Sequence, residues 1–415
     1  MALAGWCRQC SAFVWVMPDG SCPKGHTAAD VSNTYETDPA PEAPMTAAAP
    51  ADAAPADSES AASIQPEPDP DPHAPADPDA PAESVPLPEA DTVRLKAADL
   101  AAAVARSGIA PGPLAPSFGA QPSPDAAGRL ATLSGRSVQI LDGAVAALAD
   151  PPRAAVAQFS VADEAVTRLV MAWSATMEQV AVVARQGWDA SVSLRSPDEV
   201  FALLAGVVGL DGGLEPLDVR VELSPTQAMA WVALADTLRR ARLHSMLLHG
   251  ASSDTCTVAD VMATLAAADA EDFRWALNML DKVMPGRASA LADAASVSAA
   301  LEGLVAAGVL NSTPADEGDV ALYGLADVGT AAFDAWSHEL SRLAVTVHGM
   351  AEGGGSAAES VLMVRDARRL WLVAIGPERG ALACLGVGGA ERVLRTVAGA
   401  AIPAPAASTA VTAAR

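Results

Sequence analysis

The pattern of apolar and polar positions first predicts a small β-hairpin at the N-terminus. Residues 13–17 are apolar, with Phe13, Trp15 and Met17 on one face, and Pro18-Asp19-Gly20 supplies a turn after them. We assign residues 1–35 to this module. A segment of this length buries too little apolar surface to fold unaided and needs a covalent or metal crosslink.

The next stretch has no periodic apolar pattern. Residues 36–92 alternate Pro, Ala, Asp and Glu, and 108–124 are again rich in Pro and Gly. Such sequences cannot bury enough apolar surface to offset the entropy of ordering the chain. We therefore predict a disordered, acidic, Pro/Ala-rich linker over 36–124, with a candidate short helix at 93–107.

Beyond residue 125 the pattern predicts strands followed by a helix, and it does so twice. In the first unit, 125–223, three β-like runs precede a helix that Ser196 caps and Pro197 opens. The second unit, 351–402, has the same order. The predicted strands are 167–173, 179–184 and 190–195 in the first unit and 360–365, 370–375 and 381–387 in the second. The helix of the second unit is 390–398, so the pattern predicts two βββα units.

Between these units, residues 224–350 read as mainly helical. Ser224 and Pro225 start a long helix to about Leu248, and three further helices and a hairpin follow. The order of helices and hairpin is typical of a winged helix. The later elements are helices at 258–268, 271–283 and 296–307 and hairpin strands at 309–311 and 320–325. With a predicted disordered tail at 403–415, the fold class is α+β and multidomain: an N-terminal zinc ribbon, a linker, and a C-terminal α/β region.

The zinc assignment rests on four residues of the N-terminal module. Cys7 and Cys10 are separated by two residues on one tight turn, and Cys22 and His26 flank a second turn in which Gly25 permits a left-handed backbone. Two such turns suit one zinc ion, which takes four nitrogen or sulfur ligands. Four protein ligands leave no open position, so the predicted zinc is structural. The alternative is that these are unrelated side chains near the terminus.

This pattern resembles zinc-ribbon and rubredoxin-like knuckle modules over residues 7–26, with His26 in place of a fourth cysteine. The resemblance implies a small metal-stabilised hairpin.

Charge narrows the range of partners. The net charge is −24, and no Lys or Arg occurs from Gly25 to Val93. The predicted recognition helix at 296–307 contains Glu302 and no basic residue, which disfavours nucleic acid because neutralisation of phosphates dominates its binding. The longest strongly apolar run, Val200 to Leu210, is about half of a membrane span. The isolated Cys256 and Cys384 are typical of a reducing compartment, so we predict a cytoplasmic protein with no membrane contact.

A second resemblance concerns the C-terminal region. The order of the strand-like segments 169–184 and 190–195, followed by an apolar helix that ends Ala205-Gly206-Val207-Val208-Gly209-Leu210, is similar to half of an EspG-type chaperone of actinobacterial type VII secretion. Those proteins are built from two pseudo-symmetric halves. The resemblance implies that the C-terminal region binds a protein partner.

The sequence thus predicts a non-enzymatic, zinc-binding adaptor or chaperone-like protein. The α/β region would bind a protein partner, and the tethered zinc ribbon would give a second contact. We identify no catalytic and no cofactor-binding residues; the only predicted cofactor is one structural zinc on Cys7, Cys10, Cys22 and His26. The alternative is a winged-helix and zinc-ribbon transcription regulator that binds DNA.

Overall fold

The chain divides into two compact units, Met1–Asp77 and Pro78–Arg415, and each is described by itself. The computed structural model describes the following residues: 2–7, 12–16, 31–37, 91–116, 120–161, 166–186, 188–250, 254–268, 272–284, 287–314, 320–350 and 356–401.

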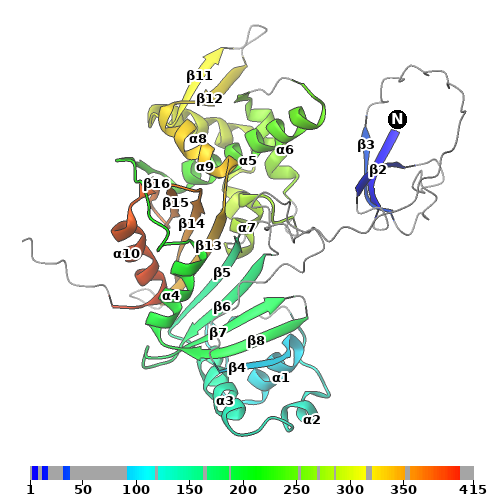
Figure 1. Cartoon of the computed structure of the whole chain (residues 1–415), viewed down its shortest axis with the longest axis vertical. Coiled ribbons are helices and arrows are strands. Elements are labelled where there is room, and N and C mark those ends of the chain that lie inside the picture. The colour runs from blue at the N-terminus through cyan, green and yellow to red at the C-terminus, as the bar shows by residue number, and fades with distance from the viewer. Residues whose placement is uncertain are drawn as a thin grey trace, which may run out of the picture. The chain divides into compact units, whose positions relative to one another are not determined.

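The smaller unit contains a three-stranded antiparallel sheet in the order β2-β1-β3 (Figure 1). Its strands are β1 (Ala2–Cys7), β2 (Ala12–Val16) and β3 (Val31–Thr37). Cys7 ends β1 and pairs with Ala12, so the connection that contains Cys10 joins the two strands of this hairpin. The other predicted ligands, Cys10, Cys22 and His26, lie outside the described residues, and the zinc site stays a prediction.

The larger unit is built on one ten-stranded antiparallel sheet, in the order β4-β8-β7-β6-β5-β13-β14-β15-β16-β9 (Figure 1). The strands of its first half are β4 (Thr92–Lys96), β5 (Arg153–Val161), β6 (Thr167–Trp173), β7 (Val180–Gln186) and β8 (Asp189–Arg195). Those of its second half are β9 (Arg220–Leu223), β13 (Ser341–Met350), β14 (Ser356–Arg365), β15 (Leu370–Ile375) and β16 (Gly380–Leu385).

The two halves repeat one arrangement around the central pair β5 and β13. Each half is a four-stranded meander followed by a helix: β5 to β8 lead into α4 (Pro197–Val207), and β13 to β16 lead into α10 (Val387–Ala398). An earlier strand completes each outer edge, since β4 pairs with β8 and β9 pairs with β16. The predicted βββα units therefore each lack their first strand, and the two units share one sheet.

One face of the sheet is covered by α4 and α10, which pack against each other. Arg395 of α10 donates to Asp198 of α4 at 2.9 Å, and its guanidinium stacks on Phe201 with its carbon 4.1 Å from the ring centre. Ser196 and Glu199 form a capping box that starts α4, as the Ser-Pro signal predicted. The core of this face includes Trp173, whose indole donates to the Ala398 carbonyl at 3.0 Å.

Two separate helical layers cover the opposite face. Over β4, β6, β7 and β8 lie α1 (Ala97–Arg106) and α3 (Arg136–Ala149), beside the short α2 (Ala126–Leu130). Over the second half lie α5 (Pro225–Leu247), α7 (Ala276–Val283) and α9 (Asp327–Ser337). The second layer also contains α6 (Val258–Ala266), the 3-10 helix η2 (Arg287–Leu291) and α8 (Ala294–Ala306).

A three-stranded sheet, in the order β10-β12-β11, accompanies these helices. It consists of β10 (Thr255–Cys256), β11 (Leu310–Pro314) and β12 (Ala321–Leu325). The hairpin predicted at 309–325 is thus present.

The segment Thr92–Arg106, which the sequence analysis placed in the linker, is folded into the larger unit. Val93 and Leu100 are buried, and Asp99 of α1 accepts hydrogen bonds from Arg129 of α2 at 2.6 and 2.8 Å. The strand is short and the helix is mostly alanine, so neither gives a strong local signal. The first two residues of the predicted linker, Glu36 and Thr37, end β3. Residues 38–90 of the linker and the predicted tail at 403–415 lie outside the described residues.

Candidate interaction surface

The long helix α5 changes its surroundings halfway along its length. Ser224 and Gln227 form a capping box, Pro225 opens the helix, and every residue from Ala228 to Leu238 is buried. Within this buried part Trp231 packs edge-to-face against Trp336 of α9, with ring centres 6.0 Å apart and an interplanar angle of 82°. The first half of α5 is thus the central element of the second helical layer.

The last turns of α5 leave the core but keep apolar side chains. Leu243 is 45% exposed, Met246 64%, Leu247 80% and Leu248 65%. Leu243, Met246 and Leu247 stand at positions i, i+3 and i+4, so they lie on one side of the helix. We call these four residues the α5 tip. A cluster of exposed apolar side chains on a rigid element is typical of a protein-binding surface.

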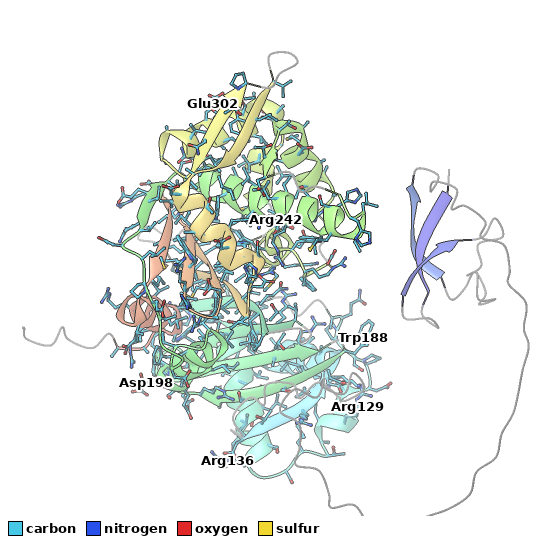
Figure 2. The ribbon with its side chains drawn as sticks, turned by 45° about the horizontal axis from the view of Figure 1, so that its top comes forward. Arg129, Arg136, Trp188, Asp198, Arg242 and Glu302 are labelled. Carbon is cyan, nitrogen blue, oxygen red and sulfur yellow. The ribbon has the colours of Figure 1, made fainter. Side chains whose placement is uncertain are left out.

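Three arginines of α5 lie just before the tip. The guanidinium carbon of Arg240 lies 4.4 Å from the ring centre of Trp275, and that of Arg242 lies 4.5 Å from the ring centre of Phe333. Arg239 also stacks on Trp275 and pairs with Glu339 at 3.3 Å. Stacking on aromatic rings holds these cations in place. Figure 2 labels Arg242 on this helix.

A buried polar network fixes α5 to its neighbours. The carboxylate of Asp236, fully buried in α5, accepts hydrogen bonds from the backbone N–H groups of Leu277 at 2.8 Å and Ala276 at 3.3 Å, at the start of α7. Burial raises the pKa of Asp236, while the charge of nearby Arg342 opposes that rise. Arg342 in turn donates to Glu339 at 2.9 Å and to the Arg274 carbonyl at 3.2 Å. The tip therefore extends from a rigidly held helix.

The described residues contain little that would support chemistry. They hold no group of three or more His, Cys, Asp or Glu side chains placed to bind a metal. Cys256 is buried, which raises its thiol pKa to about 12 and makes it a poor nucleophile at neutral pH. Burial likewise raises the pKa of Cys384 and lowers that of His348. A hollow of about 350 Å³ beside Ser360, Pro377 and Glu378 is open to solvent.

Two further observations concern nucleic acid and membranes, which the sequence analysis did not favour as partners. The predicted recognition helix is α8, and its residues include Glu302 but no Lys or Arg. Among the described helices none is both long enough and apolar enough to cross a membrane.

The sequence analysis did not identify the α5 tip. It placed a helix from Ser224 to about residue 248 but made no prediction about the end of that helix. The signal was available: Leu243, Met246, Leu247 and Leu248 follow the arginines, where an exposed helix end normally turns polar.

Comparison with known proteins finds similarity among solved structures but not among family models or curated sequences. No protein-family model and no curated protein matches the sequence. Among solved structures, the chain is similar to the Mycobacterium tuberculosis type VII secretion system chaperone EspG5, whose structure was solved in complex with the PE25-PPE41 dimer. The TM-score is 0.36 at 12% sequence identity, over 74% of this chain and 95% of that one.

Proposed function

We propose that this protein is a non-enzymatic, chaperone-like adaptor whose C-terminal unit binds a protein partner through the α5 tip. The observation that carries the proposal is the exposure of Leu243, Met246, Leu247 and Leu248 at the end of a helix that is otherwise buried. Transfer of apolar surface from water contributes roughly 25 cal/mol per Å². A partner that covers the tip would therefore gain several kcal/mol from these side chains.

The arginines beside the tip indicate the chemistry of that partner. Arg240 places positive charge next to the apolar side chains, beside Arg239 and Arg242, which pair with Glu339 and Asp254. An amphipathic helix with an apolar stripe and flanking acidic residues would complement both features. Leucine and methionine side chains adapt to different apolar shapes, which suits a chaperone-like surface.

The proposal includes one structural zinc ion on Cys7, Cys10, Cys22 and His26. It is supported by the spacing of these residues and by the position of Cys7 at the end of β1, next to the turn that contains Cys10. The zinc module would give a second contact for the partner. Thiol titration of the native protein tests it: chelation should release three reactive thiols, because Cys256 and Cys384 are buried. Equal labelling with and without chelator would contradict the zinc site.

A capture experiment tests the protein-binding proposal. Immobilised wild-type protein, Leu247→Asp and Val387→Asp are each incubated with native lysate from the source organism, and the eluates are analysed for protein and nucleic acid. Val387 is a matched control because it is 45% exposed and apolar, but lies at the start of α10.

We expect one polypeptide that wild type and Val387→Asp retain and Leu247→Asp loses, and that binds again when purified. Light scattering of the purified protein distinguishes such a partner from a second copy of this chain. Equal capture by all three proteins, or recovery of nucleic acid alone, would contradict the proposal; the latter would favour the DNA-binding alternative.

A further inference from the structure

The large sheet ends at β9, which pairs with β16 and, in the part of the chain that the structure describes, with no strand on its other side. Figure 1 labels β16 at this end of the sheet. The Cys384 N–H donates to the Val219 carbonyl at 3.1 Å, and these two residues continue the register of β9 and β16. Backbone groups in an antiparallel pair point alternately toward the neighbouring strand and away from it. Val219 and every second residue after it therefore direct their backbone groups toward β16, whereas Arg220 and Glu222 direct theirs outward.

The side chains of β9 divide between the two faces of the sheet. Leu223 is buried in the core that α5 covers, and Val219 and Val221 pack against the same core. Arg220 and Glu222 alternate with them, so their side chains point to the opposite face, and both are exposed. Neither has an ion-pair partner among the residues that the structure describes. The outer edge of β9 thus offers free backbone groups beside one cation and one anion.

We propose that two copies of this chain associate by antiparallel pairing of β9 with β9 of the second copy, about a twofold axis at Val221. In this register Arg220 of each copy is directly opposite Glu222 of the other. The outward N–H and C=O groups of these residues then bond to each other across the axis. Opposite charges on directly opposite residues stabilise antiparallel strands. The edge is therefore self-complementary, as a twofold interface requires.

The charges also specify the register. Only registers that bring outward residues opposite outward residues form the backbone bonds, so the alternatives are shifted by two residues. A shift in one direction places Arg220 opposite Arg220 of the second copy, and a shift in the other places Glu222 opposite Glu222. Like charges directly opposite each other destabilise the pair. The register centred on Val221 is thus favoured over both of its neighbours.

The other outer edge of the same sheet has the contrasting arrangement. The Ala97 N–H donates to the Trp188 carbonyl at 3.0 Å and continues the register of β4 and β8. By the same alternation, Arg94 and Lys96 direct their backbone groups outward. Two copies of β4 paired about Arg94 would therefore place cations opposite each other, and such charges commonly protect a free edge from pairing. Self-complementary charge is a property of β9, and not of both edges of the sheet.

The interface is small and separate from the α5 tip. Four residues of β9 form far less than a standard interface of about 1,600 Å², so the dimer should be weak, with a dissociation constant of order tens of micromolar. The helix α5 begins just after β9, and its tip lies roughly 30 Å away at about 1.5 Å per residue. Pairing of β9 therefore leaves the tip free, and the dimer carries two tips. This inference does not rest on the proposed function: Leu247→Asp should leave the dimer unchanged.

Sedimentation velocity of the full-length protein over a concentration series tests the proposal. Physiological ionic strength is needed, because it screens the repulsion between two chains of net charge −24 beyond about 8 Å. Wild type should shift from monomer to dimer. Arg220→Glu and Glu222→Arg should each weaken the dimer at least about tenfold, because each places like charges opposite each other.

The matched control is Glu302→Arg, which makes the same charge change at an exposed residue of α8 that Figure 2 labels. It should dimerise as wild type does. The two β9 variants change the net charge in opposite directions, so a loss in both cannot come from net charge. A wild type that stays monomeric, or β9 variants that dimerise like the control, would overturn the proposal. The first result would leave the edge to a strand of another protein.

An equimolar mixture of the two β9 variants separates pairing from misfolding. One variant has two acidic side chains at positions 220 and 222, and the other has two basic ones. Each variant opposes like charges when it pairs with itself, whereas the mixed pair opposes unlike charges at both positions. We expect the mixture to form heterodimers about as tightly as wild type. A mixture that associates no better than its separate components would overturn the proposed pairing.

Disulfide crosslinking tests the register itself. In the proposed dimer position 221 is opposite itself, with Cα atoms about 4.5 Å apart, which is within the range for a disulfide. Two copies of position 219 are more than about 13 Å apart. Under mild oxidation Val221→Cys should therefore form a dimer linked through position 221, identified by peptide mass spectrometry, and Val219→Cys should not. Wild type gives the background from the native cysteines. Equal crosslinking at both positions, or none at 221, would overturn the proposal.

Discussion

The two halves of the large sheet have the same strand order but differ in how one shared face is covered. The first half carries α1 and α3 with the short α2, and α7 reaches its strand β5, whereas the second half carries a layer built from α5 to α9. In the second half the polar groups at Thr346 and Ser360 are paired beneath this layer. In the first half, β5, β6 and β7 carry Gln158, Arg168 and Arg185 in one register row on this face. The same strand order thus carries two helical layers of different size, and the larger one includes α5 with its exposed tip.

Removal of the central aromatic pair should give the largest effect. Trp231→Ala leaves a cavity between α5 and α9, and a buried Trp→Ala change costs about 3–5 kcal/mol of unfolding free energy. Urea unfolding measures the total, and hydrogen exchange locates it. We expect faster exchange in α5, α8 and α9 while β6 to β8 stay protected. Equal acceleration in both halves would contradict the view that the two layers are separate.

Removal of the Asp236 carboxylate should have the next largest effect. Asp236→Ala leaves the first N–H groups of α7 without their acceptor and removes negative charge near buried Arg342, which should cost about 1–3 kcal/mol. Asp236→Asn keeps one acceptor oxygen and should lose less. Thermal unfolding of both variants gives the order. An Asn variant as unstable as the Ala variant would show that charge, rather than capping of α7, determines the effect.

A smaller loss should follow when the paired row of the second half is broken. Thr346→Val keeps the shape of the side chain but removes the hydrogen bond to Ser360, at a cost of about 1 kcal/mol. Arg168→Met, in the register row of the first half, removes a buried Nε–H that has no hydrogen-bond partner among the described residues, so it should not destabilise the protein. Opposite changes in thermal midpoint would sharpen the contrast between the rows, and equal losses would remove it.

The smallest expected effect is a loss of stability in α1 and α2 at acidic pH. Hydrogen bonds from Arg129 lower the pKa of Asp99, so the folded state favours the carboxylate. This contribution is present above the ordinary carboxyl pKa and is lost as the pH falls through the lowered value. It is small because the Arg129 side chain is 51% exposed. Hydrogen exchange in α1 and α2 should therefore rise at acidic pH before that in α8. Simultaneous loss would show that this ion pair does not hold the first layer.

The sequence predicted the strands in which apolar and polar residues alternate, or which are bounded by turn residues. β6, β7, β8, β14, β15 and β16 and the capped starts of α4 and α5 were all recognised, because Ser-Pro and Gly signals are local. The central strands β5 and β13 were missed. Both are buried on two faces within the sheet, so their sequences do not alternate between apolar and polar residues.

The candidate binding surfaces could not be predicted in the same way. Arg220 and Glu222 are visible in the sequence, but only the strand order places them at the outer edge of the sheet. The α5 tip was readable in sequence, but its exposure depends on where the surrounding helices end. Pairing of β4 with β8 is a long-range contact, which explains why 92–96 looked like linker.

Site-specific photo-crosslinking in the source organism tests the central claim, that the α5 tip binds a protein, most directly. A photoreactive amino acid replaces Leu247 in one variant and Val387 in the other, and irradiated cells are examined for adducts. The account predicts a defined polypeptide adduct from position 247 and none from position 387. Adducts from neither position, equal adducts from both, or crosslinks from 247 only to nucleic acid would contradict it.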